Sequence, residues 1–281
     1  MRPASSLPTF HQRSAEVGGI RIHYAEVPAD RPNLLMIHGI GMDWRVWQAV
    51  SRRLSPLFHL YLVDLRGHGG SDKPARGYSL AHYAADIEDF IEQLDLAPVV
   101  LVGSSLGGMV AATVEAPADV VTHRVLVDPP LTGGPIRDAP MFREILRLKH
   151  EPAPRLANYL EEYNPKAGQF YLRIMAQMWC EASDGVIEDM LERPDDYYAV
   201  DQSLRLVEAP TLLMRADPEL GGVLSSSEAE RALRLLPRGA LMDFPGSGHA
   251  IHAYQPSAFV QAVSEFVGHS VVPGDLPGIG I

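Results

Sequence analysis

Short apolar runs alternate with amphipathic stretches along most of this chain of 281 residues. Runs such as 33–39 and 98–104 are too apolar to keep one face in water, and a segment with helical spacing follows each of them. Buried strands of this kind belong to parallel sheets that helices cover on both faces. The sequence therefore predicts an α/β fold with a mostly parallel eight-stranded sheet, whose strands lie in 14–27 (a hairpin about Gly18-Gly19), 33–39, 58–67, 98–104, 123–130, 210–216 and 240–244.

One long segment interrupts the alternation. From Leu131 to Val207 there is no strand-like run, and helical stretches are separated by prolines instead. We therefore expect an α/β core formed by residues 1–130 and 208–281, and a helical unit formed by 131–207 that is inserted between two of the later strands. The tails 1–13 and 269–281 are expected to be irregular.

Composition and missing motifs exclude several classes of protein. A formal net charge of −11 argues against a nucleic-acid partner. No run has the length of a membrane helix and no secretory signal is visible, so we expect a cytoplasmic protein without a membrane span. Cys180 is the single cysteine, which rules out an intrachain disulfide. The sequence has no H-E-x-x-H motif, cysteine cluster, P-loop lysine or dinucleotide fingerprint, so we expect no metal and no other cofactor.

The segment "VVLVGSSLGGMVAAT" (99–113) holds the strongest chemical signal. Gly103, Ser105 and Gly107 form G-x-S-x-G between an expected buried strand and an expected helix. In this motif the serine occupies a sharp, strained turn that raises its hydroxyl above the sheet, and glycine is needed two residues to either side because a side chain would clash. Ser105 is therefore the candidate nucleophile, and Ser104, which lacks the pair of flanking glycines, is expected to be structural.

With this motif the chain resembles the α/β-hydrolase family. The resemblance covers about residues 15–268 and rests on four stretches in family-like order, "HGIGMDWRVW", "VDLRGHGGSDKP", "VGSSLGG" and "PGSGHAIH". It implies an α/β-hydrolase fold with a helical cap after the sixth strand, which is where the insertion falls. It also implies a hydrolase that uses a serine nucleophile, a histidine base and a carboxylate.

The resemblance places the base at His249, in a loop that follows the last strand. A base is needed because a serine hydroxyl is a poor nucleophile until its proton is removed. His252 lies three residues later and is the rival, although it falls where the closing segment begins. His38 and His68 each adjoin a glycine at a strand end, and we expect both to be buried histidines that bond to the backbone.

The carboxylate that orients the imidazole has three candidates. The family usually supplies it just after the seventh strand, where Asp217 ends the strand directly. Glu219 fits the usual spacing better, but its side chain is longer and it lies later in the loop. A minority of the family uses the end of the sixth strand, where "VLVDPP" offers Asp128. Asp217 is the first choice, ahead of Asp128 and then Glu219. A candidate that is not the catalytic carboxylate is expected to help form a turn, as Asp-Pro pairs commonly do.

Two backbone N–H groups are expected to form the oxyanion hole, from Leu106 and from Ile40. The expected substrate is a small molecule, a carboxylic ester or lactone cleaved through an acyl-enzyme. Alternatives are a carbon–carbon bond hydrolase with the same triad and a non-catalytic protein that binds a small molecule. The sequence indicates no oligomeric state. Apolar residues of the insertion are expected to line the substrate pocket, namely Met141, Phe142, Tyr171, Met175 and Met178.

Overall fold

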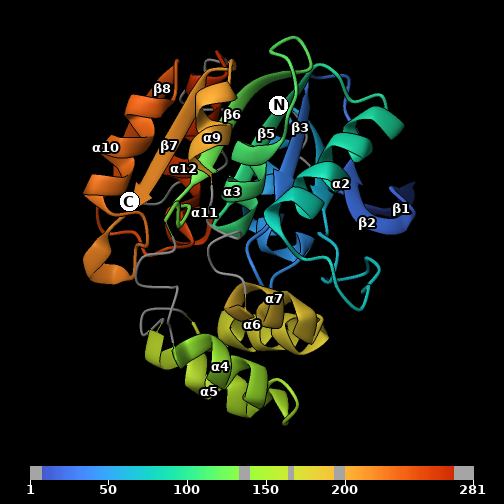
Figure 1. The fold of residues 1–281 in the computed structure, drawn as a ribbon, viewed down its shortest axis with the longest axis vertical. Coiled ribbons are helices and arrows are strands. Elements are labelled where there is room, and N and C mark those ends of the chain that lie inside the picture. The colour runs from blue at the N-terminus through green and yellow to red at the C-terminus, as the bar shows by residue number, and fades with distance from the viewer. Residues whose placement is uncertain (1–7, 133–139, 164–167, 193–199, 269–281) are drawn as a thin grey trace, which may run out of the picture.

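The computed structural model describes residues 8–132, 140–163, 168–192 and 200–268. In this part of the chain one sheet forms the centre of the molecule (Figure 1). Its eight strands are β1 (His11–Val17), β2 (Ile20–Val27), β3 (Asn33–Ile37), β4 (His59–Val63), β5 (Val99–Ser104), β6 (Val121–Val127), β7 (Thr211–Ala216) and β8 (Gly239–Phe244).

The strand order is β1-β2-β4-β3-β5-β6-β7-β8. The β1–β2 and β2–β4 pairs are antiparallel and every other pair is parallel. The predicted α/β fold with a mostly parallel eight-stranded sheet is thereby confirmed. Residues 11–13, expected to be irregular, instead pair with residues 24–26 as the first part of β1, because the hairpin about Gly18-Gly19 is longer than its apolar residues indicate.

Helices cover both faces of the sheet. One face carries the short 3-10 helix η1 (Trp44–Trp47), α1 (Gln48–Leu54), α11 (Ile251–Tyr254) and α12 (Pro256–Phe266). The other carries α2 (Leu80–Gln93), α3 (Leu106–Thr113), α9 (Asp201–Leu206) and α10 (Ser226–Leu235). Side chains cap the start of two of these helices: the carboxylate of Asp43 accepts from Arg45 N–H at η1, and the Ser79 side chain accepts from His82 N–H at α2.

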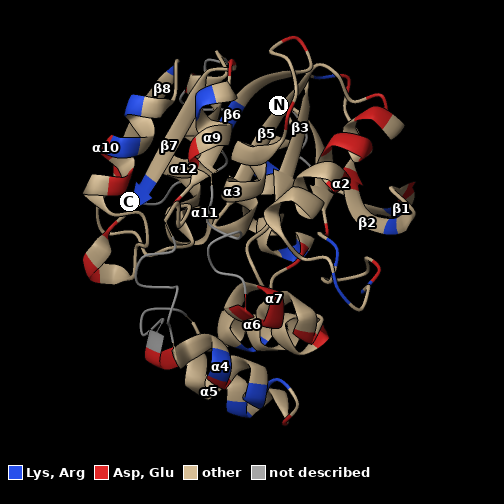
Figure 2. Cartoon of the chain, viewed as in Figure 1, with Lys and Arg blue, Asp and Glu red and all other residues tan. Residues whose placement is uncertain are grey.

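The central strands are buried on both sides. In β3, Leu34 and Met36 point into one core and Leu35 and Ile37 into the other, as the alternation of side chains along a strand requires. Figure 2 shows no charged residue on β3 or β5, whereas the outer helix α2 carries several acidic ones. Burying each such aliphatic side chain is worth about 1.5–3 kcal/mol, so the sheet is a rigid base for the residues at its strand ends.

Of the described helices between β6 and β7, four lie together beyond the sheet (Figure 1). They are α4 (Pro140–Leu148), α5 (Ala153–Tyr163), α6 (Gln169–Glu181) and α7 (Asp184–Glu192). Within the described part of 131–207 there is no strand. The helix α9, also inside the predicted insertion, packs against α3 and α10 instead, so it belongs to the layer that covers the sheet. No helix in the described ranges has both the length and the apolarity to cross a bilayer.

Candidate active site

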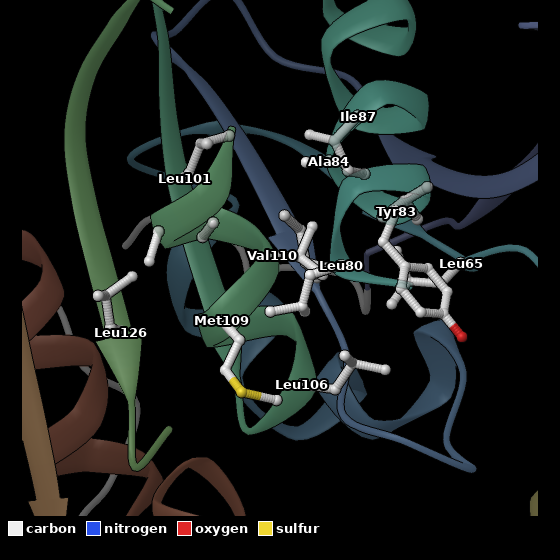
Figure 3. Packing of buried hydrophobic residues seen from close by; sticks show 14 of the residues in the cluster. Leu65, Leu80, Tyr83, Ala84, Ile87, Leu101, Leu106, Met109, Val110 and Leu126 are labelled. Atoms are coloured by element: carbon white, nitrogen blue, oxygen red, sulfur yellow. The ribbon is translucent and has the colours of Figure 1, made fainter. Parts of the chain in front are cut away.

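Ser105 lies at the tight turn between β5 and α3. Its backbone has φ 54° and ψ −117°, a conformation that L-residues rarely adopt. A Cβ on Gly103 would lie 2.0 Å from the oxygen of Gly107, and a Cβ on Gly107 would lie 2.1 Å from the oxygen of Ile37, so both positions require glycine. Figure 3 shows how the turn is held: Leu106 and Val110 of α3 pack against apolar side chains of α2 and the sheet.

His249 is held by Asp128. The imidazole Nδ1 lies 2.6 Å from Oδ2 of Asp128, which follows β6 directly with a positive φ of 45°. Three backbone N–H groups also donate to this carboxylate, from Ala216, Val223 and Leu224 at 2.9–3.2 Å. Burial alone would raise the pKa of Asp128, but the hydrogen bond and charge of His249 together with these N–H groups outweigh it and lower the pKa below its usual range.

This pairing determines what the imidazole can do. An ionised carboxylate only accepts hydrogen bonds, so the proton of neutral His249 is placed on Nδ1 and Nε2 is left as an acceptor. Asp128 is completely buried, while the His249 side chain is 33% exposed. His249 and Ser105 line the same cavity, so the imidazole and the hydroxyl face one shared space. The arrangement places an imidazole that a carboxylate orients at the same cavity as a serine on a strained turn.

Asp217, our first choice from the sequence for the carboxylate, has a different environment. Its side chain accepts hydrogen bonds from the N–H groups of Glu219 and Gly246 at 3.0 and 2.9 Å. It caps the short helix η3 (Pro218–Leu220), which is the turn chemistry typical of an Asp-Pro pair. Glu219 is exposed on that helix. The geometry therefore favours Asp128, the second choice from the sequence, because its carboxylate forms a hydrogen bond with His249 Nδ1 at 2.6 Å.

Two backbone N–H groups near Ser105 have no hydrogen-bond acceptor among the described residues. Within the described ranges, the N–H groups of Ile40 and Leu106 have no protein acceptor, whereas Gly41 donates to His68 Nε2 at 3.0 Å and Met42 donates to Gly39 at 3.2 Å. Ile40 lines the cavity together with Ser105, and Leu106 is the first residue of α3. Two unpaired N–H groups beside a nucleophile are what an oxyanion hole needs.

His38 and His68 are both fully buried and bond to backbone, as predicted. His38 contacts the Gly39 oxygen through Nδ1 and accepts from Leu65 N–H at Nε2; His68 contacts the Arg66 oxygen through Nδ1 and accepts from Gly41 N–H. Their rings lie 4.9 Å apart. Through these hydrogen bonds the two histidines connect the loop that contains Ile40 with the turn that follows β4, which is a structural role.

His252, the rival base, is buried against Trp47, with ring centroids 4.4 Å apart. In the described part of the chain neither of its ring nitrogens has a hydrogen-bond partner. Burial, with a smaller effect of His249, lowers the pKa of His252 to about 3. A histidine without a carboxylate partner and with so weak a basicity is poorly suited to take a proton from serine, so the geometry favours His249.

These three buried histidines make stability depend on pH. Burial lowers the pKa of His38, His68 and His252, so all three are neutral in the folded protein, whereas the unfolded chain protonates them near pH 6.5. Unfolding then takes up protons below that pH. We expect the free energy of unfolding to be highest above pH 6.5 and to fall below it by up to about 1.4 kcal/mol per pH unit for each histidine.

Denaturant unfolding at pH 7.5, 6.5, 5.5 and 4.5 measures this dependence. His252→Phe removes one titrating group from an apolar site and should reduce the slope below pH 6.5 by up to about 1.4 kcal/mol per pH unit. An unchanged slope in this variant would contradict a neutral His252 in the folded state.

The cavity that holds Ser105 and His249 has a volume of about 190 Å³. Four of the five predicted pocket residues line it, namely Met141, Phe142, Tyr171 and Met175, while Met178 lines a neighbouring cavity. Sequence reasoning missed Ile145 and Trp179, although each lies one helical turn after a predicted residue. It also missed Val46 and Val223, which come from distant segments and carry no sequence signal.

The described lining of this cavity carries no permanent charge. It contains no Asp, Glu, Lys or Arg, and its polar side chains come from serine, tyrosine, tryptophan and histidine. In the same described ranges, no group of three or more His, Cys, Asp or Glu side chains is placed to hold a metal ion.

Comparison with known proteins assigns the family. Residues 34–262 match the family model described as "Alpha/beta hydrolase family", and the chain belongs to that family. The 2-(acetamidomethylene)succinate hydrolase of Mesorhizobium japonicum is 29% identical over 92% of this chain and 95% of its own length. The N-formylmaleamate deformylase of Pseudomonas putida is 27% identical over 92% and 97%. The enol-lactonase of Burkholderia xenovorans LB400 has the same fold, with a TM-score of 0.75 at 18% identity over 91% of this chain and 99% of its own.

Proposed function

We propose that this α/β hydrolase cleaves a carboxylic ester or lactone with Ser105 as nucleophile, His249 as base and Asp128 as the carboxylate. The observation that carries the proposal is the hydrogen bond between His249 and Asp128 at the wall of the cavity that also holds Ser105. A serine on a strained turn, an oriented imidazole and two unpaired N–H groups meet the requirements of acyl transfer.

The reaction follows from this arrangement. Ser105 Oγ attacks the carbonyl carbon while His249 Nε2 takes the hydroxyl proton, and Asp128 stabilises the imidazolium that forms. The N–H groups of Ile40 and Leu106 bind the oxyanion of the tetrahedral intermediate. When that intermediate collapses, His249 gives its proton to the leaving oxygen. Water then attacks the acyl-enzyme with His249 again as base, and the acid product leaves.

The substrate is proposed to be uncharged near the reacting bond. Transferring a carboxylate from water into an apolar cavity is costly unless a cation pairs with it, and no cation is among the described lining residues. By their names, the succinate hydrolase and the maleamate deformylase act on carboxylic acids. We therefore propose that the substrate of this chain lacks the carboxylates that these two names indicate.

A second candidate is cleavage of an acyl–nitrogen bond. The relatives favour it, because one is named a deformylase of an N-formyl compound and another a hydrolase of an acetamidomethylene compound, and each matches over 92% of this chain. The same serine, histidine and oxyanion donors serve both bonds, since only the leaving atom differs. Because one site can catalyse both reactions, the two candidate functions can be distinguished only by comparing substrates.

The test has two stages. First, a fluorophosphonate probe should label Ser105 in the wild-type protein and not in Ser105→Ala, as read by mass spectrometry. Second, kcat/KM is compared for neutral p-nitrophenyl esters, lactones and N-formyl amides, and for the matched pair of methyl p-nitrophenyl succinate and its free acid. We expect the neutral ester to exceed the free acid by at least about tenfold. Faster turnover of the free acid would overturn the proposal of an uncharged substrate, and faster turnover of the amides would overturn the ester assignment. An unlabelled Ser105 would overturn the serine mechanism.

A further inference from the structure

A second cavity adjoins the one that contains Ser105. We call the Ser105 cavity the inner chamber and its neighbour the outer chamber. The inner chamber has about 190 Å³ and the outer chamber about 560 Å³. A cavity of about 150 Å³ holds one benzene molecule, whereas ligand pockets commonly span about 300–1,000 Å³. The inner chamber is therefore large enough for a reacting group and a few attached atoms, whereas the outer chamber by itself has the volume of an ordinary ligand pocket.

The two chambers share their walls. Val46 of η1 and Tyr171 of α6 line both of them. The segment after β8 also contributes to both, since His249 and Ala250 line the inner chamber and Tyr254 lines the outer one. Three separate elements thus run past both chambers, which makes the outer chamber a continuation of the candidate active site and not an unrelated hollow.

Two faces of the helix α6 line the two chambers, one face for each chamber. Met175 and Trp179 lie one and two turns after Tyr171 and line the inner chamber. Ile174 and Met178 fall on the adjacent stripe of the helix and line the outer chamber. Tyr171 lies at the boundary between the two stripes and lines both chambers.

Mostly apolar residues line the outer chamber, and this lining suits an uncharged ligand. Phe170, on its rim, has 79% of its surface exposed, the largest fraction among the large apolar residues of the described ranges. The charged residue of its described lining is Arg45, whose guanidinium is already bonded to Asp43 and Glu181. An apolar surface that is left exposed beside a candidate active site is typical of a ligand-binding surface.

We propose that the outer chamber is a second substrate subsite that binds an uncharged, apolar extension of the substrate beyond Tyr171. This inference rests on the proposed hydrolase function and adds the substrate class: neutral acyl compounds whose reacting group fits the inner chamber and which carry an alkyl or aryl part of several carbons. Each methylene that moves from water into the outer chamber is worth about a fourfold gain in kcat/KM.

Neighbouring positions on α6 provide the test. Ile174→Trp fills the outer chamber, Met175→Trp fills the inner chamber, and Arg173→Trp places the same side chain at an exposed position that lines neither. Steady-state kcat/KM is measured for p-nitrophenyl acetate against octanoate, which extends the acyl half, and for ethyl acetate against octyl acetate, which extends the alcohol half.

In the wild type we expect the long member to exceed the short one by at least about 100-fold in at least one pair, which is the gain from about three to four methylenes in the outer chamber. Ile174→Trp should lower that long-to-short ratio by tenfold or more. Met175→Trp should lower kcat/KM for both members and keep the ratio within about threefold. Arg173→Trp should leave both values unchanged. A ratio that Ile174→Trp does not alter in either pair would overturn the subsite.

A second measurement keeps the outcome clear if Ile174→Trp is poorly folded. The rates at which short-chain and octyl fluorophosphonates label Ser105 report access to each chamber without turnover. Faster labelling of the wild type by the octyl probe, lost in Ile174→Trp, supports the subsite, and equal rates for the two probes in the wild type overturn it. If no probe labels Ser105 and no short ester is hydrolysed, the hydrolase proposal itself has failed.

Discussion

Ser105→Ala is expected to abolish turnover and to leave the fold intact. Removing the nucleophile of a triad costs about 10⁶-fold in kcat, because no other group in the site forms the acyl-enzyme. The side chain is small and 9% exposed, and its Cβ remains in place, so the free energy of unfolding should change by under about 1 kcal/mol. Ester hydrolysis and denaturant unfolding on the same preparation measure both quantities. Hydrolysis within tenfold of the wild type would refute the role of Ser105.

Ser105→Gly is the matched control for the turn. A positive φ at a residue with a Cβ costs on the order of 1–3 kcal/mol, and glycine relieves it, although glycine also gives the unfolded chain more freedom. We expect this variant to be inactive like Ser105→Ala but more stable than it by about 1 kcal/mol. Equal stability of the two variants would mean that the turn stores no strain.

Asp128→Asn should lower kcat by about 10⁴-fold. An amide nitrogen opposite Nδ1 favours the wrong tautomer of His249, in which Nε2 carries a proton and no longer accepts one from Ser105. The same change removes an acceptor from buried backbone N–H groups, which should lower the free energy of unfolding by about 1–3 kcal/mol. Pre-steady-state acylation with a p-nitrophenyl ester measures the kinetic effect directly.

Asp217→Asn is the comparison that decides between the carboxylates. Asp217 bonds to backbone N–H groups of Glu219 and Gly246, and asparagine keeps one acceptor oxygen, so we expect kcat to fall by less than about tenfold. Gly246 belongs to the loop that carries His249, which accounts for a small effect. A larger loss in Asp217→Asn than in Asp128→Asn would return the catalytic carboxylate to the end of β7.

The sheet and the position of Ser105 were predictable because their signals are local. Apolar runs identify the buried strands, the Gly18-Gly19 pair marks the hairpin, and Gly103 is required by atoms of the turn itself. Gly107 is required by the backbone of β3, but the G-x-S-x-G spacing that reveals it is also local. Likewise, five apolar residues of the insertion were expected in the pocket; Met141, Phe142, Tyr171 and Met175 line it, whereas Met178 lines the neighbouring cavity. In each case the signal lies within a short stretch of the sequence, even where the contact that it serves, such as that of Gly107 with β3, is made by a distant strand.

What only the tertiary structure decided is which distant groups meet. Asp128 and Asp217 both end a strand and both precede a proline, so nothing local distinguishes them. The difference arises because Asp128 adopts a positive φ at the end of β6. Its carboxylate accepts hydrogen bonds from the N–H groups of Ala216, at the end of the neighbouring strand β7, and of Val223 and Leu224, which follow that strand. The second chamber has the same origin, because Val46, Tyr171 and Tyr254 come together through packing between segments that are far apart in the chain. Such contacts depend on how the elements dock, and the sequence of any one element does not contain that information.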